Sequence, residues 1–335
     1  MGKVTMREIG SAVGVSAVTV SKALAGQPGM SEKTRNRILK VAEQMGYSYP
    51  NTDKVRERMN LDIGILIPDK YFQSDSFYSV IYRKLVQRLA KSGHFGLLEL
   101  LPEAAETALE LPNLVKSRHV DGLIVLGEPG LNYHRMIAGQ NFPVVFLDFY
   151  DEQCAADSVV GDNSYGCYRL TGHLIRNGHT RIGFVGNYRA TGSIMDRYLG
   201  FCRAMLSHDL PIRPEWILPD RDLHGSLLPL QLPEDMPTAF VCNCDLVARQ
   251  LIDQLRASGY RVPEQISVTG FDDYLAGEGS SHEISTFRMD LDSMVELSIK
   301  AITDRCSGLK KPFGRTVVSG QPVYRCSEAA CPDLP

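Results

Sequence analysis

The stretch VGVSAVTVSKAL, residues 13–24, combines small apolar side chains with one lysine on the expected front of a helix. Ser16 is a good N-terminal cap, so the helix is expected to start one residue later. Its outward side then carries Ala17, Val18 and Lys22. Small apolar groups can contact thymine methyls, and a lysine can donate to O6 and N7 of guanine. An ordinary exposed helix surface is the simpler alternative, but the pattern favours contact with base-pair edges.

Hydroxyl side chains flank this helix front. Hydroxyls suit phosphate oxygens, which set the register of a protein on a duplex without reading its sequence. We therefore expect them to position the helix on DNA. The residues assigned to this role are Thr5, Ser16, Thr19 and Ser21.

Three short helices are predicted to hold this surface, over residues 6–13, 17–25 and 32–45. Thr5 and Glu8 form a capping box at the start of the first helix. Because so few residues separate the first two helices, they must cross tightly, as in a helix-turn-helix. The side chains of the third helix expected to face inward are Ile38, Leu39, Ala42 and Met45.

The charge of the chain is unevenly distributed. Residues 1–60 hold ten Lys and Arg against five Asp and Glu, an excess of about five positive charges. The whole chain carries −3, so the remainder carries about −8. A basic head on an acidic body is typical of a nucleic-acid-binding module joined to a domain with another role.

A resemblance to a known family covers almost the whole chain. It is strongest in VTMREIGSAVGVSAVTVSKALAGQPGMSEKTRNRILKVAEQMGY (4–47), with Gly10 where alanine is usual. Further matching stretches follow in family order, including VDGLIVLG (120–127), PVVFLD (143–148) and RVPEQISVTGFDD (261–273). The chain resembles the lac repressor (LacI/GalR) family of transcriptional regulators.

The resemblance implies a function and its partners. The expected function is sequence-specific control of transcription, as a repressor of carbohydrate-related genes. A homodimer would present two headpieces to double-stranded, near-palindromic operator DNA. A sugar or sugar derivative would bind as effector in a cleft between two subdomains and change the affinity for the operator.

The body alternates short β-branched runs with helical patterns, which predicts parallel sheets with crossover helices. The number of strands suits two sheets better than one. The expected fold is α/β: a three-helix headpiece joined to a periplasmic-binding-protein-like core of two doubly wound parallel-sheet subdomains. The predicted strands are 63–67, 96–101, 122–126, 144–147, 182–185, 239–242 and 266–270.

Acidic residues follow several of these strands. In open α/β sheets, ligands bind outside the carboxyl ends of the strands, and carboxylates there can accept hydrogen bonds from sugar hydroxyls. Positions that match the family's effector contacts are Asp148, Arg197, Asp245 and Asp272. The further candidates are Asp69, with Phe72 and Phe77 as apolar stacking walls. Turn or helix-cap chemistry is the alternative role for each single aspartate.

The segment between head and body lacks the motif that forms a minor-groove helix in many family members. Val55 and Met59 have helical spacing, and either is a candidate wedge into the minor groove. Arg56 suits a phosphate contact. A solvated linker is an equal alternative. We expect any helix here to fold on DNA, because isolated helices this short are marginal.

The expected domain organisation has three parts. Residues 1–47 form the headpiece, 48–61 the hinge, and 62–335 the effector-binding and dimerisation core. Within the core, one subdomain takes about 62–160 plus 292–319, and the other takes about 161–291 plus 320–335.

Other classes of protein fit less well. A sugar-binding transport protein would share the body, but it would need an export signal and no basic head. An enzyme acting on a sugar is less favoured, because GxSxG, P-loop, HExxH and strand-linked GxGxxG patterns are missing. Cys242 and Cys244 have poor zinc spacing. We therefore expect no catalytic residue, no metal, no cofactor, no membrane association and a cytoplasmic location.

Overall fold

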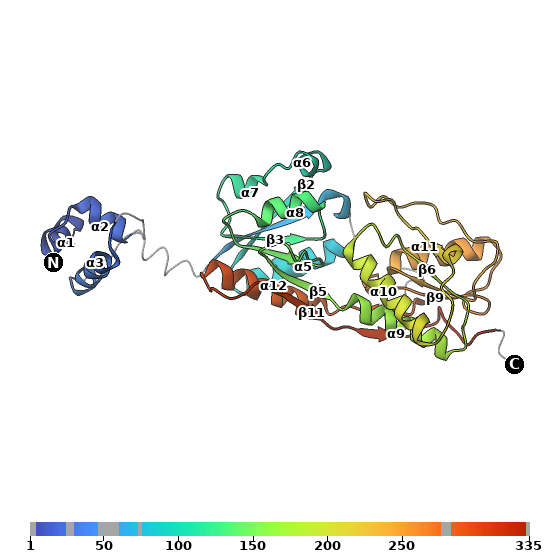
Figure 1. Ribbon diagram of the computed structural model, residues 1–335. Helices are drawn as coiled ribbons and strands as arrows, with labels where there is room; N and C mark the ends of the chain where they lie inside the picture. Colours follow the sequence, from blue (N-terminus) through green and yellow to red (C-terminus); the bar gives the residue numbers. More distant parts are fainter. Residues whose placement is uncertain (1–4, 25–29, 46–59, 73–75, 276–282, 333–335) are drawn as a thin grey trace. The chain divides into compact units, whose positions relative to one another are not determined.

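The computed structural model describes residues 5–24, 30–45, 60–72, 76–275 and 283–332 (Figure 1). The chain divides into two compact units, residues 1–61 and 62–335. We call them the headpiece and the body and describe each by itself. In the described part of the chain, no helix is long and apolar enough to cross a membrane.

The described residues of the headpiece form three helices, whose bounds closely match the predicted ones: α1 (Met6–Val13), α2 (Ala17–Leu24) and α3 (Glu32–Gln44). The predicted capping box is present at α1, where the Glu8 N–H donates to Thr5 Oγ1 and the Thr5 N–H donates to Glu8 Oε2. Gly14 ends α1 with a φ of 80°, in the left-handed region that suits glycine.

A small apolar core lies between the three helices. Its buried members are Ile9, Val13, Val20, Ala23, Ile38 and Ala42. The prediction that Leu39 faces inward is wrong, since 40% of this residue is exposed. Ile38 and Ala42 occupy the inner side of α3, and Leu39 lies about 100° further round the helix axis than Ile38.

The body contains two parallel sheets, as predicted. The larger one has six strands in the order β11-β5-β4-β3-β1-β2, and every neighbouring pair is parallel. These strands are β1 (Asp62–Pro68), β2 (Phe95–Leu101), β3 (Gly122–Leu126), β4 (Val144–Leu147), β5 (Asp157–Gly161) and β11 (Arg315–Val318).

Helices cover both faces of this sheet. Helices α5 (Phe77–Lys91) and α12 (Leu291–Cys306) lie on one face, and α8 (Leu131–Ala138) lies on the other (Figure 1). Two short helices, α6 (Glu103–Thr107) and α7 (Asn113–Lys116), follow β2. A short 3-10 turn, η1 (Asp69–Tyr71), follows β1 directly.

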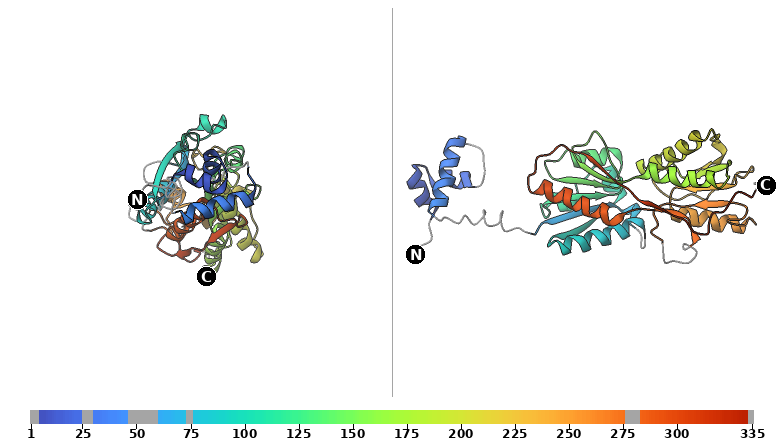
Figure 2. Two further views of the ribbon diagram at one scale, coloured as in Figure 1. Left: turned by 90° about the vertical axis from the view of Figure 1, so that its left-hand side faces the viewer. Right: turned by 90° about the horizontal axis from the view of Figure 1, so that it is seen from below.

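The smaller sheet has four parallel strands in the order β7-β6-β8-β9. Helices α9 and α10 pack together on one of its faces and α11 covers the opposite face (Figure 2). The bounds are β6 (Ile182–Val185), β7 (Ile217–Leu218), β8 (Ala239–Cys242), β9 (Ser267–Thr269), α9 (Asn163–Arg176), α10 (Gly192–Ser207), α11 (Asp245–Ala257) and the 3-10 turn η2 (Pro214–Trp216).

The chain passes between the two sheets three times. It leaves β5 for α9, returns to α12 after β10 (Thr286–Arg288), and leaves β11 for β12 (Gln321–Val323). Strands β10 and β12 pair antiparallel beside these passages. Two sheets that are joined by three adjacent chain segments can move about a common hinge, so a cavity between the sheets can open and close.

Candidate functional sites

The front of α2 carries an exposed apolar side chain. Val18 is 66% exposed, whereas Val20 on the opposite side of the same helix is fully buried. Lys22 is also exposed, and Ala17 and Ser21 are half-buried. The structure thus brings the predicted base-contacting residues onto one side of α2, away from the headpiece core.

The predicted phosphate-contacting hydroxyls also have roles within the headpiece. Ser16 caps α2, since its Oγ accepts the Thr19 N–H at 3.1 Å and lies 2.8 Å from Thr19 Oγ1. Thr5 Oγ1 donates to Glu8 Oε2 at 2.9 Å. These bonds fix the hydroxyls in place at the start of α1 and α2. The predicted hinge contacts lie outside the described residues, namely Val55, Arg56 and Met59.

Gly10 allows the turn after α1 to approach the helix closely. A Cβ at this position would lie 2.6 Å from the carbonyl oxygen of Val15. The Gly10 carbonyl accepts the N–H groups of both Gly14 and Val15. The departure from the family's usual alanine therefore has a local cause, which the helix pattern alone did not reveal.

In the body, a cavity of about 550 Å³ lies where the carboxyl ends of strands from both sheets meet. It is the size of a small-molecule site. Of the predicted effector residues, the cavity is lined by Phe77, Asp148, Arg197 and Asp272.

Arg197 and Asp272 form a buried ion pair in the wall of this cavity. Arg197 Nη2 lies 2.9 Å from Asp272 Oδ1, and its Nε donates to Asn163 Oδ1 at 2.8 Å. Its Nη1 donates to the main-chain oxygen of Asn243, and its guanidinium lies 4.1 Å from the ring centre of Phe271. Every nitrogen of the guanidinium therefore has a protein acceptor. Burial raises the pKa of Asp272, and Arg197 opposes that rise.

Asp148 is the carboxyl group of this cavity without a cationic partner in the described structure. It follows β4 with a φ of 73° and is 4% exposed. The Tyr78 hydroxyl donates to Oδ2 at 3.0 Å, and Oδ1 has no hydrogen-bond partner among the described residues. Burial raises the pKa of Asp148 to about 7, Arg197 lowers it and Asp272 raises it further.

Aromatic rings form one continuous wall of the cavity. The ring centres of Tyr71 and Tyr78 are 5.1 Å apart, and those of Phe77 and Tyr78 are 5.4 Å apart. Tyr274 from the other side of the cavity meets Phe77 edge-on at 5.8 Å. Of these rings, only Phe77 was predicted from the sequence to line the site. Tyr78 follows it on α5, whereas Tyr71 and Tyr274 lie in segments without a helix or strand pattern long enough to orient them.

Three predicted effector residues lie outside the lining of this cavity. Asp245, the first residue of α11, accepts from Thr286 Oγ1 and from the Asp273 N–H, both at 2.7 Å. It thus holds the loop that carries Asp272 rather than facing the cavity. Asp69 is exposed at the start of η1, and Phe72 packs edge-on against Tyr82 at 5.5 Å.

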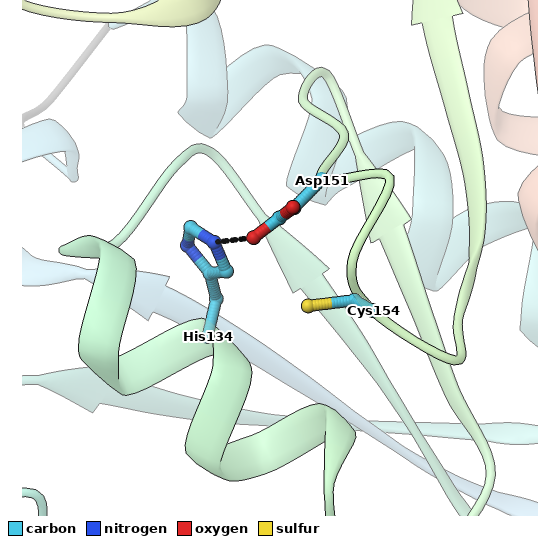
Figure 3. A group of neighbouring side chains, drawn as sticks. All are labelled: His134, Asp151 and Cys154. Atoms are coloured by element: carbon cyan, nitrogen blue, oxygen red, sulfur yellow. Dashed lines mark hydrogen bonds and ion pairs between the residues drawn. The ribbon is translucent and has the colours of Figure 1, made fainter.

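A group of potential metal ligands lies elsewhere in the body. His134 on α8 and the side chains of Asp151 and Cys154, from the loop after β4, point toward one another, with ligand atoms within 4.8 Å (Figure 3). Arg135 Nε already lies 2.6 Å from Asp151 Oδ2, the same oxygen that faces His134 at 3.1 Å. Burial raises the pKa of the Cys154 thiol to about 11. Asp151 is already paired with Arg135, and the raised pKa keeps the Cys154 thiol protonated at neutral pH. Both features argue against a bound cation at this group.

Comparisons with known proteins find one matching family model for the headpiece and another for part of the body. A model of bacterial regulatory proteins of the lacI family matches residues 5–51, and one of a periplasmic binding protein-like domain matches 171–327. The HTH-type transcriptional repressor PurR of Glaesserella parasuis is 26% identical over 310 residues, covering 90% of this chain and 89% of the relative.

Two solved structures show the same fold over nearly the whole chain. The transcriptional regulator CelR in complex with cellobiose has a TM-score of 0.67 at 20% identity, covering 97% of this chain and 100% of that one. The lac repressor dimer bound to operator and the anti-inducer ONPF has a TM-score of 0.66 at 20% identity, covering 98% and 100%.

A helix-turn-helix unit followed by a periplasmic-binding-protein-like body defines a DNA-binding regulator of transcription. The chain belongs to the LacI family of bacterial regulatory proteins, and it is a DNA-binding transcriptional repressor of that family. The relatives are regulators and not enzymes, so the alternatives of a transport protein and of a sugar-processing enzyme are set aside.

Proposed function

We propose that this repressor acts on carbohydrate-related genes and that a small sugar-like effector in the body controls its affinity for operator DNA. The observation that carries the proposal is the cavity in which Asp148 and Asp272 lie beside aromatic rings. Carboxylates accept hydrogen bonds from sugar hydroxyls, and apolar walls with a few polar groups are typical of small-molecule sites. Cellobiose in the CelR complex supports the same ligand class.

The headpiece would read the operator with the front of α2. Ala17 and Val18 would contact thymine methyls, and Lys22 would donate to a guanine. Thr5, Ser16, Thr19 and Ser21 would contact phosphates and fix the register. The hinge residues Val55, Arg56 and Met59 stay predictions of contacts near the operator centre.

A homodimer would present two headpieces to a near-palindromic operator. The solved lac repressor structure, a dimer bound to operator, supports this assembly. The edge strand β2 supports a dimer surface, because its Phe95, Leu97 and Leu100 are all exposed. Unpaired apolar edge strands favour association with another chain. We therefore place the contact between the two copies at β2.

Effector binding would act on the relative position of the two sheets. Glu128, after β3, accepts the N–H of Gly192 at the start of α10 at 2.7 Å, which joins the two sides of the cavity mouth. An effector that favours one arrangement of the sheets shifts the equilibrium between arrangements. Coupling of this kind changes the affinity for the operator typically by about 5–150-fold.

The test uses the full chain and a random library of DNA duplexes. Selection for binding is expected to enrich one near-palindromic sequence, and a panel of sugars is then screened for a change in affinity for it. An active sugar should lose its effect in Asp272→Asn while operator binding without sugar is retained. Failure to enrich any sequence would contradict the operator role, and enrichment without any sugar response would contradict the effector role.

A further inference from the structure

The connection from β7 to β8 has an unusual form. These strands lie on opposite sides of β6, and such crossovers usually carry a helix. Residues 219–238 contain no helix. Instead, Arg221 and Leu227 pair in a small antiparallel bridge, and Asp222 N–H donates to the Ser226 carbonyl. Long connections without secondary structure are often functional.

The tip of this hairpin, residues 221–227, reaches the opposite side of the cavity. A Cβ at Gly225 would lie 3.6 Å from Cε1 of Tyr71 in η1, which follows a strand of the larger sheet. Arg221, Gly225, Ser226 and Leu227 all line the cavity. The hairpin therefore adds to the cavity side chains that neither sheet supplies.

Asp220 fixes the Arg221 guanidinium at the base of the hairpin. Asp220 is 1% exposed, and its Oδ1 accepts the Asn187 N–H at 2.8 Å. Its Oδ2 accepts from Asn243 Nδ2 at 2.9 Å and from Arg221 Nε at 2.7 Å. A guanidinium held by such a network is preorganised for a ligand. Arg221 Nη1 has no acceptor among the residues that the structure describes.

Arg197 and Lys70, the other cationic side chains that line the cavity, already interact with other residues of the protein. Arg197 gives all its nitrogens to protein acceptors. Lys70 lies 3.9 Å from Glu106 Oε1 and 5.1 Å from the ring centre of Tyr71. Each terminal nitrogen of Arg197 keeps one further N–H, but the Arg197 side chain is 5% exposed against 16% for Arg221. Arg221 Nη1, which has no acceptor among the described residues, is therefore the guanidinium nitrogen more open to a ligand, and the planar fork of arginine suits carboxylate and phosphate oxygens.

The two carboxyl groups in the wall do not exclude an anion. Asp272 is neutralised by Arg197 at 2.9 Å. Asp148 accepts a hydrogen bond from Tyr78 and is influenced by the charges of Arg197, Asp272 and Glu128, and its pKa of about 7 leaves it largely uncharged in slightly acidic solution. Protonated Asp148 donates a hydrogen bond from the oxygen that now has no partner.

We propose that the effector is an acidic sugar derivative whose carboxylate or phosphate group accepts hydrogen bonds from Arg221. The proposal rests on the effector-controlled function stated above and narrows its ligand class. The hairpin would then serve as the part of the body that selects for the acidic group, while Asp272 and the aromatic wall hold the sugar ring.

Matched pairs of compounds test this assignment by calorimetry on the full chain at pH 6, where Asp148 is largely uncharged, and at constant ionic strength. The pairs are glucose with glucuronate, glucose with glucose 6-phosphate, ribose with ribose 5-phosphate, and cellobiose with cellobionate. At least one acidic member should bind about tenfold or more tightly than its neutral partner, as a charge-assisted hydrogen bond provides. The carboxylate and phosphate pairs separate the two kinds of acid.

Three variants complete the test. Arg221→Gln should remove the preference for the acidic member, and Arg221→Lys should keep part of it because the charge stays. Arg189→Gln is the matched control, since Arg189 packs over Tyr188 outside this cavity. Thermal melts show whether each variant is folded.

Two results would overturn the assignment. One is that no acidic member binds more tightly than its neutral partner, and the other is that Arg221→Gln keeps the preference. A neutral sugar that binds and shifts operator affinity would reject the acidic effector while leaving the proposed function intact. Absence of any preferred operator sequence would instead reject the proposed function.

Discussion

The hydroxyl of Tyr78 and the carboxyl of Asp148 form a buried pair, with Oη and Oδ2 3.0 Å apart. Tyr78 comes from α5 and Asp148 from the end of β4, so the pair joins a helix that covers the larger sheet to one of its strands. Because the second oxygen of Asp148 lacks a protein partner in the described structure, the pair positions a carboxyl group for a ligand without saturating it.

This pair makes the stability of the body depend on pH. The pKa of Asp148 is about 7 in the folded chain, against 3.8 for an ordinary aspartate. The folded state therefore binds an extra proton between these values, so stability is lost as the pH rises from about 4 through 7. The effect is worth up to about 4 kcal/mol.

The Asp148→Asn variant measures this contribution. Asparagine tolerates a positive φ and stays neutral, so the variant should unfold with a flatter pH dependence and be more stable than the parent at pH 8. Urea unfolding at pH 5 and pH 8 gives the comparison. Equal pH dependence in the two proteins would show that Asp148 is ionised in the folded chain.

Lys22 distinguishes base reading from backbone contact. If Lys22 donates to a guanine, Lys22→Ala should cost about 1–3 kcal/mol on the preferred operator and relax the preference at one base pair. Binding to a set of single-base operator variants measures this. Lys40→Ala, an exposed lysine on α3, is the control. Uniform weakening on every sequence would assign Lys22 to a phosphate.

The Arg197–Asp272 pair should show strong energetic coupling. Arg197→Met leaves a buried carboxylate without its partner and should destabilise the body by about 3–5 kcal/mol. The double variant Arg197→Met with Asp272→Asn should recover much of that loss, because no buried charge remains and asparagine tolerates the φ of 99° at this position. Denaturant unfolding of both single variants and the double variant gives the coupling. Simple additivity of the two changes would argue against the pairing.

The β2 edge tests the dimer. Leu97→Lys adds a charge to the proposed contact and should shift the chain from dimer to monomer at micromolar concentration. Light scattering after size-exclusion chromatography measures the molar mass and so distinguishes dimer from monomer. Leu206→Lys changes an exposed leucine on α10 and should have no effect. A dimer that survives Leu97→Lys would place the interface elsewhere.

Gly10 tests the tight turn of the headpiece. Gly10→Ala places a Cβ 2.6 Å from the Val15 carbonyl, so the turn or α1 must shift. We expect a loss of about 1–3 kcal/mol in headpiece stability and weaker operator binding, with effector affinity unchanged. Thermal unfolding of the headpiece, followed by circular dichroism, measures the loss of stability. Unchanged stability would mean that the turn yields easily.

The sequence predicted the elements of regular structure well. The strands at 122–126, 144–147, 182–185 and 239–242 have the bounds expected from their β-branched runs. Strands β5, β7, β10, β11 and β12 were not predicted. They are short, and β7, β10 and β12 lie beside loops or at the passages between sheets, where tertiary pairing rather than periodicity decides the conformation.

The candidate site was predictable only where it follows strand ends. Asp148 and Asp272 follow strands β4 and β9 and line the cavity, as the parallel-sheet rule expects. Asp245 obeys the same rule yet faces Thr286, because it begins a helix and its carboxylate holds the neighbouring loop. Arg221 and Tyr274 lie in irregular segments, whose course depends on contacts far apart in the sequence.

The helix-free connection between β7 and β8 gives the protein a replaceable recognition element. Its two ends are held by Asp220 and by Gln254, which donates to the Leu230 carbonyl at 3.0 Å, while the segment between them crosses the mouth of the cavity. We expect that hairpins of other length or composition between these anchors would change the cavity lining and leave the strands of both sheets in place. The chain is therefore a scaffold for engineered biosensors in which a new metabolite is matched by exchanging a single surface loop.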